Sequence, residues 1–239
     1  MPVLPGLYLN FRAQALAAIR PGSRGVVAVP VKAHWGPVRQ FVEITSEAGI
    51  TDSYTADESG GATAYAILRL ALLGGAKKVL AYRLAGTSAA KASTVLKDGL
   101  AVDVLTLTAL YEGTRGNGFK VTVRDNPVDP ANKKDILLYE GTVLLRTFTF
   151  AKGASIVDNA VAAINSDTGN RWITAAKLAD GNGTLADVAG QAFAGGDSGI
   201  AGVQASDYTN WLAALETQVF DLLALDGVAD SAIQTSVIA

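Results

Sequence analysis

The sequence predicts an α/β domain that is interrupted by an inserted antiparallel β-sandwich or barrel and preceded by an extended N-terminal arm. Three observations predict this fold class. Buried strands alternate with a helix in residues 25–84, short strands rich in β-branched residues follow from about residue 93, and strand–helix alternation returns after residue 205.

These changes of pattern divide the chain into four parts. We assign residues 1–20 to the arm, 21–100 to the first part of the α/β core, 101–199 to the inserted sandwich, and 200–239 to the resumed core.

Composition excludes several classes of protein. With 49% apolar and 18% charged residues the chain of 239 residues is globular, and a net charge of −2 argues against nucleic acid as a main partner. There are no cysteines, so disulfides and thiolate metal sites are excluded, which fits assembly in a reducing cytoplasm. The longest apolar stretch, residues 64–76, is shorter than the roughly 20 residues that cross a bilayer, and the N-terminus lacks a signal-peptide pattern. We therefore expect a soluble protein without membrane insertion.

The N-terminal arm is the first predicted element. Pro5 favours extended backbone before it, and Leu7, Leu9 and Phe11 then alternate as in a strand that ends at the polar turn 20–25. An isolated strand of this kind either folds back on its own domain or pairs with another chain.

The α/β core follows the arm. We predict strands at 25–31, 39–45 and 77–84 and a helix at 60–73, stopped by a Gly-Gly pair. The apolar stripe of that helix contains Tyr65, Leu68, Leu72 and Leu73. Its spacing between strands predicts a right-handed crossover and a parallel strand pair.

The insertion is predicted from short β-branched segments. We expect strands at 93–99, 102–111, 119–125 and 171–179, with a hairpin at 135–150 that turns at Glu140 and Gly141. One short helix at 154–165 takes Ser155 as its N-cap.

After the insertion we predict a helix at 206–218 with Ser206 as its N-cap, a strand at 219–225, and a further helix from residue 229. The apolar face of the first helix carries four residues: Tyr208, Trp211, Leu212 and Leu215. The sequence stops inside the last helical pattern, so we expect it to be a piece of a longer protein whose C-terminal domain is missing here.

The stretch "YEGTRGNGFKVTV" (111–123) is the first candidate site, because glycines around an arginine can present N–H groups to a phosphate. Phosphate loops, however, precede a helix, and here Gly113, Gly116 and Gly118 precede a strand. We predict a glycine turn that joins two strands.

The stretch "GGDSG" (195–199) resembles the nucleophile motif of trypsin-like proteases. The single histidine, His34, precedes Ser198 in the chain order of those enzymes. His34 lies in "KAHWG" beside Trp35, however, and Ile200 follows the motif. We therefore favour a packed histidine over a catalytic base.

The remaining carboxylates predict no metal or catalytic site. In "DGNGTLAD" (180–187), Leu185 occupies the position where calcium loops need glycine and Gln191 that of their glutamate, and one histidine without cysteine leaves no zinc site. Asp125 and Asp129 lie in a proline-containing loop, where spacing alone leaves an acid pair open. We expect no cofactor, no metal and no enzymatic activity.

Several linked stretches resemble one family. "PGLYLNFRA", "RGVVAVPVKAHWGP", "ALYEGTRGNGFKVTV", "FAGGDSG" and "YTNWLAALETQVFDLLAL" together resemble contractile-tail sheath proteins of bacteriophages and phage-like bacteriocins. The resemblance implies a subunit of a virion or phage-like particle tail, assembled in the bacterial host cytoplasm. Such subunits stack as six-fold rings around an inner tail tube protein, with a baseplate and a tail terminator at the ends, and contract to drive the tube through a cell envelope. It also implies that the arm joins neighbouring subunits, with Leu7, Tyr8, Leu9 and Phe11 as the pairing residues.

Two other functions stay open at this stage. A hydrolase on the α/β domain would use Ser198, and a non-contractile surface or capsid module would need the sandwich but no arm.

Overall fold

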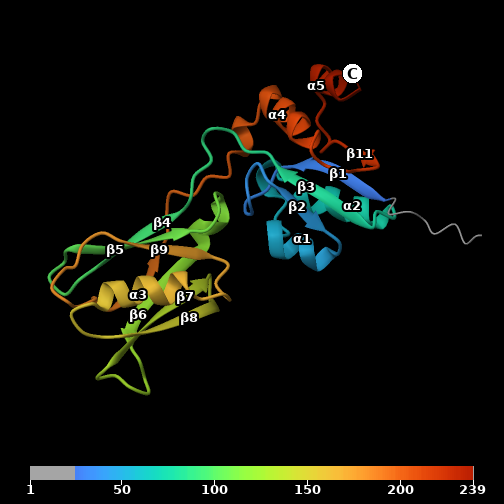
Figure 1. Cartoon of the computed structure of the whole chain (residues 1–239). Helices are drawn as coiled ribbons and strands as arrows, with labels where there is room; N and C mark the ends of the chain where they lie inside the picture. Colours follow the sequence, from blue (N-terminus) through green and yellow to red (C-terminus); the bar gives the residue numbers. More distant parts are fainter. Residues whose placement is uncertain (1–24, 239) are drawn as a thin grey trace, which may run out of the picture.

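The computed structural model describes residues 25–238, which form two domains joined by two chain crossings (Figure 1). The predicted pairing residues Leu7, Tyr8, Leu9 and Phe11 lie outside the described residues. Gly25 begins the first domain, an α/β layer structure, and an inserted β-sandwich forms the second.

The α/β domain is built on a four-stranded sheet in the order β11-β1-β3-β2. Its strands are β1 (Val26–Val31), β2 (Phe41–Ile44), β3 (Lys78–Arg83) and β11 (Leu222–Leu223). Strand β1 runs parallel to both β3 and β11, and β2 is antiparallel to β3. A parallel pair is thus present, but it joins β3 to β1, whereas β2, the strand nearest before the predicted helix, is antiparallel to β3.

Helices cover both faces of this sheet, as Figure 1 shows. The helices are α1 (Glu47–Tyr54), α2 (Ala64–Leu73), α4 (Ala205–Leu215) and α5 (Ser231–Ile238). Val27 and Val29 of β1 pack in one cluster with Leu68 of α2, whereas Ala28 packs in a second cluster with Trp211 of α4. Successive side chains of a strand point to opposite faces, so the alternation along β1 selects which helices lie on which face. Each fully buried valine or leucine side chain stabilises the fold by roughly 1.5–3 kcal/mol.

Of three sequence predictions at helix ends, the structure contradicts two and confirms the position of one, Ser155. Ser206 is not the N-cap of α4, because Gln204 takes that position. Gln204 and Asp207 form a capping box, in which the Gln204 N–H donates to Asp207 Oδ2 at 3.0 Å. Ser155 is the N-cap of helix α3 (Ile156–Asn165), but its side chain makes no capping hydrogen bond. Leu73 is not on the buried stripe of α2, since it is 70% exposed in the last turn.

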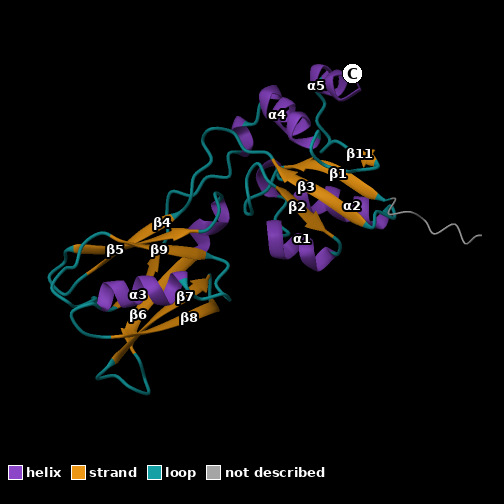
Figure 2. Cartoon of the chain, viewed as in Figure 1, coloured by secondary structure: helices purple, strands orange, loops and turns teal. Residues whose placement is uncertain are grey.

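The inserted domain is a sandwich of two antiparallel sheets, ordered β10-β6-β7-β8 and β4-β5-β9 (Figure 2). The strands are β4 (Ser93–Lys97), β5 (Asp103–Ala109), β6 (Phe119–Asp125), β7 (Lys133–Glu140), β8 (Val143–Ala151), β9 (Ile173–Lys177) and β10 (Val188–Ala192). The predicted sandwich is confirmed, and so is the hairpin between β7 and β8, where Gly141 has a φ of 60°.

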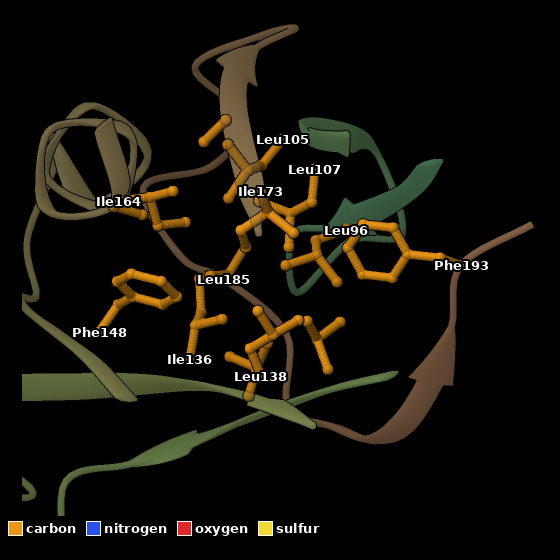
Figure 3. Close-up of a cluster of buried hydrophobic side chains, with 14 of the residues drawn as sticks. Leu96, Leu105, Leu107, Ile136, Leu138, Phe148, Ile164, Ile173, Leu185 and Phe193 are labelled. Atoms are coloured by element: carbon orange, nitrogen blue, oxygen red, sulfur yellow. The ribbon is translucent and has the colours of Figure 1, made fainter. Parts of the chain in front are cut away.

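The sandwich core lies between these sheets and under helix α3 (Ile156–Asn165). Figure 3 shows Leu105 and Ile173 of one sheet facing Ile136 and Leu138 of the other, with Ile164 of α3 at one side. This continuous apolar core makes the sandwich a folding unit with its own interior.

Candidate functional site at the junction of the two domains

Two antiparallel linkers, residues 84–92 and 194–202, connect the domains. The Gly86 N–H lies 2.9 Å from the Gly199 carbonyl oxygen, and Ala90 and Asp197 exchange two backbone hydrogen bonds of 2.9 and 3.0 Å. The linkers therefore form a paired ribbon rather than two independent tethers.

The segment 33–36, which follows β1, reaches from the α/β domain into the sandwich; we call it the anchor segment. Its Trp35 is 2% exposed and belongs to the sandwich core cluster. The indole makes edge-to-face contacts with Tyr111 and Phe119 at centroid distances of 5.3 and 5.4 Å. The Arg115 guanidinium lies 5.4 Å from the ring centroid, a cation–π distance. One aromatic side chain thus fastens the two domains together.

Arg83, the last residue of β3, is fully buried where the anchor segment meets both linkers. Its Nη1 donates to the carbonyl oxygens of Gly36 (2.7 Å) and Glu112 (2.8 Å), and its Nη2 to that of Ser198 (3.3 Å). Burial lowers the pKa of the guanidinium to about 10, with Glu112 and Tyr54 opposing that shift, so the group stays charged at neutral pH. A buried cation therefore ties three separate chain segments through their backbones.

His34 makes a second tie between the same regions through side chains. Its Nε2 lies 2.9 Å from the Ser59 carbonyl oxygen, and its Nδ1 lies 2.7 Å from Ser198 Oγ and 2.9 Å from Thr114 Oγ1. Because a carbonyl only accepts, we assign the proton to Nε2 in the neutral ring, which leaves Nδ1 to accept from a hydroxyl. The ring thus joins the α/β domain to the turn between β5 and β6 and to the linker 194–202.

The structure brings His34 and Ser198 together, as the hydrolase alternative requires, but the pair is not accessible. Ser198 is 3% exposed, and its Oγ also accepts the Thr114 N–H at 3.2 Å. A neighbouring cavity of about 320 Å³ is lined by His34, Asp57 and Arg115 but not by Ser198. The serine hydroxyl therefore holds chain segments together and is closed to a substrate.

Among residues 25–238, no carboxylate takes the triad position at the imidazole. Asp57 Oδ2 lies 3.9 Å from His34 Nε2, which bonds the Ser59 carbonyl oxygen instead. That distance is outside hydrogen-bonding range, so Asp57 does not orient the ring as the acid of a triad does.

The glycine stretch that resembled a phosphate loop belongs to the same junction. Gly113 has a φ of 143°, and a Cβ at this position would lie 1.8 Å from the His34 carbonyl oxygen. A short 3₁₀ turn, Thr114–Gly118, follows and leads directly into β6. The predicted turn between strands is confirmed, and glycine is required because the anchor segment passes so close.

The carboxylates of residues 180–187 do not converge on one point. Asp180 pairs with Lys177, and Asp187 pairs with Lys134 at 2.6 Å. The loop is instead organised by Asp98, which accepts the N–H groups of Asn182, Leu100 and Val102. Burial opposes ionisation of Asp98, but these three donors outweigh it and lower its pKa.

The other acidic candidates are also paired. Asp125 lies 2.6 Å from Lys152, and Asp129 accepts from Asn132 at 2.9 Å. Residues 25–238 contain no cluster of three acidic, histidine or cysteine side chains suited to a metal. In the same part of the chain, no helix has the length and apolar character to span a membrane.

Sequence patterns did not identify Arg83, Trp35 or Thr114 as junction residues. The one available signal of the junction was Trp35 in the turn "KAHWG". A large aromatic side chain in a turn indicates that another part of the molecule buries it.

A separate apolar surface lies at the β11 edge of the α/β sheet. A groove of about 340 Å³ between α2 and β11 is lined by Val27, Ile67, Leu70, Leu222 and Leu225, among others. Leu70 and Leu222 are 63% and 60% exposed. Exposed leucines on a helix and on the strand edge beside it are typical of a surface that another segment covers.

Comparisons with known proteins agree with this architecture. Residues 75–198 match the model of the phage tail sheath protein beta-sandwich domain, and residues 24–84 match that of the tail sheath protein Gp18 domain III N-terminal region. The phage-like element PBSX protein XkdK of Bacillus subtilis is 32% identical over 92% of the chain. The uncharacterized protein YqbK of the same organism is 29% identical over 92% of the chain.

Solved structures show the same fold. The sheath tail protein Lin1278 from Listeria innocua is 28% identical and superposes with a TM-score of 0.68 over 91% of this chain. The sheath tail protein from Desulfitobacterium hafniense has a TM-score of 0.67 over 97% of the chain at 23% identity.

The chain spans only 44–48% of the length of these four proteins. The sandwich model alone matches about half of the present sequence. The match covers every strand of the inserted domain, from β4 to β10, and begins earlier, just before β3 of the α/β sheet. The chain therefore belongs to the phage tail sheath protein family.

Proposed function

We propose that this chain is the N-terminal part of a contractile tail sheath subunit. It polymerises with copies of itself as stacked six-fold rings around an inner tube protein, and contraction of the rings drives the tube through a target envelope. A baseplate and a tail terminator bound the sheath, in a phage or a phage-like bacteriocin particle assembled in the host cytoplasm. The observation that carries this proposal is the match of the inserted sandwich to the sheath family, with the flanking α/β segment matching a second sheath model.

The topology of the α/β sheet supports the interpretation that the remaining half of the protein completes this domain. From β3 the chain reaches β11 through α4, and α5 then packs on the same face as α4. A right-handed connection through α5 would place a following parallel strand on the outer edge of β11. That strand would lie beside the exposed Leu222 and the groove under α2, which gives the apolar edge an occupant.

The arm supplies the links between subunits in this proposal. Leu7, Leu9 and Phe11 alternate in the manner of a strand, and strand addition to a neighbour gives backbone hydrogen bonds together with buried alternate side chains. Such a link persists while the bodies of the subunits rotate, which a sheath with an extended and a contracted state requires.

Deleting residues 1–14 from the full-length protein is expected to abolish assembly, because the strand that joins neighbouring subunits is lost. In a sedimentation assay, the full-length protein should pellet and the deleted protein should stay in the supernatant. The circular dichroism spectrum and the unfolding midpoint should be unchanged. Normal pelleting of the deleted protein would contradict the role of the arm.

A matched pair of variants separates side-chain pairing from mere length. Replacing Leu7, Leu9 and Phe11 with serine should reproduce the deletion. Replacing Asn10 and Arg12, on the other side of the strand, with serine should leave pelleting intact.

A further inference from the structure

The paired linkers alone do not determine how the sandwich is oriented on the α/β domain. Two antiparallel segments can twist together, and domains of one chain move relative to each other unless a large apolar interface prevents it. A fixed orientation therefore requires further groups in residues 25–238 that restrain this movement.

The interface beyond the anchor segment is open. Beside the cavity next to His34, two more cavities of about 170 and 410 Å³ separate α1 from the sandwich. Both are lined by Asp52 of α1, by Arg171 of the sandwich and by Trp35. Close packing between α1 and the sandwich therefore does not fix their orientation.

Trp35 supplies affinity between the domains but little directional restraint. Its contacts to Tyr111 and Phe119 are apolar and edge-to-face, and the apolar contribution to such contacts does not depend on direction. Hydrogen bonds from a rigid donor group, in contrast, are lost when the acceptors move by about 1 Å.

We propose that Arg83 and His34 are positioning residues that hold the sandwich in one orientation on the α/β domain. Arg83 is the last residue of β3 and donates to carbonyl oxygens of the anchor segment, of Glu112 and of the linker 194–202. His34 contacts the same linker through the Ser198 hydroxyl and is itself fixed by the Ser59 carbonyl oxygen. Two planar groups from one domain thus hold both the turn between β5 and β6 and the linker 194–202.

This inference stands whatever the chain assembles into, because it concerns the internal geometry of one subunit. Without Arg83 and His34, the sandwich would stay attached by Trp35 and the linkers but would sample several orientations.

Distance measurements between spin labels test the inference on the chain as it is. The sequence contains no cysteine, so Leu73→Cys on α2 and Val143→Cys on β8, both well exposed, give a unique label pair across the junction. Pulsed electron paramagnetic resonance should give one narrow distance distribution in the labelled parent. In Arg83→Met/His34→Leu the distribution should broaden about twofold, as expected for domain motion.

A control separates orientation from stability. Asn165→Ala removes two hydrogen bonds of 2.8 and 2.9 Å to Ala175 within the sandwich, so it should lower the unfolding midpoint and leave the distance distribution unchanged. A parental distribution in the folded double variant would overturn the inference.

If the double variant fails to fold, single substitutions with smaller effects test the orientation of the sandwich instead. Ser198→Ala removes only the hydroxyl that His34 contacts, and His34→Gln keeps an amide donor toward Ser59. Ser198→Ala should broaden the distribution, and His34→Gln should broaden it less than His34→Leu. Parental distributions in all three would show that the cluster serves stability alone and would overturn the inference.

Discussion

Trp35→Ala is expected to lower the free energy of unfolding by about 3–5 kcal/mol, the range for truncating a buried tryptophan. The indole is 2% exposed in the sandwich core although it belongs to the α/β domain, so its loss leaves a cavity and removes the apolar attachment between the domains. Urea unfolding followed by far-ultraviolet circular dichroism measures the change, with each transition fitted separately if the domains no longer unfold together.

Phe220→Ala is the control for Trp35→Ala. Phe220 lies beside the open β11 edge and is 37% exposed, so its truncation should lower the free energy of unfolding much less than Trp35→Ala does. Equal losses for the two variants would show that Trp35 does not fasten the domains.

Gly113→Ala is expected to destabilise the protein by about 3–5 kcal/mol, since it adds a steric overlap to a strained backbone conformation. The new Cβ would lie 1.8 Å from the His34 carbonyl oxygen, and the φ of 143° is one that alanine rarely adopts. The overlap is with backbone, so a side-chain rotation cannot relieve it. Thermal unfolding and urea titration measure the loss.

The same stretch supplies a matched control. Gly118 has no left-handed φ, and no atom lies within 4 Å of a Cβ built on it. Gly118→Ala should therefore change stability by no more than about 0.5 kcal/mol. If both substitutions were tolerated, the close approach of the anchor segment to Gly113 would be wrong.

Periodic elements could be predicted from the sequence, because burial on a regular lattice leaves a regular pattern. The apolar face of α4 is confirmed, with Tyr208, Trp211 and Leu215 buried and Leu212 half-buried. Helix α1 and strand β10 were not predicted. The first is only eight residues long and buries just Ile50 and Tyr54, and the second has no buried residue at all.

The junction could not be predicted from local pattern, because its partners are distant in the chain. His34 and Ser198 are 164 residues apart, and Arg83 meets Ser198 across 115 residues. The sequence raised His34 and Ser198 as a possible catalytic pair, and the fold does bring them together. Their burial and their bonds to Thr114 and Ser59 give the pair a structural role. The unusual residue types were a correct signal of a special place, and the packed histidine favoured over a catalytic base agrees with the burial of His34.

The requirement for glycine at position 113 also depends on a residue that is distant in the chain. Gly113 was singled out because glycines around an arginine resemble an anion loop, and the succession of strands excluded that function. Only the structure shows why glycine is needed there, since the approaching backbone comes from residue 34.

Negative-stain electron microscopy of the complete reading frame, beside the 239-residue chain, tests the sheath assignment most directly. We predict hollow striated tubes from the complete protein and separate particles from the present chain. Well-behaved monomers from both would contradict self-assembly and would favour a non-contractile surface or capsid module built on the same sandwich.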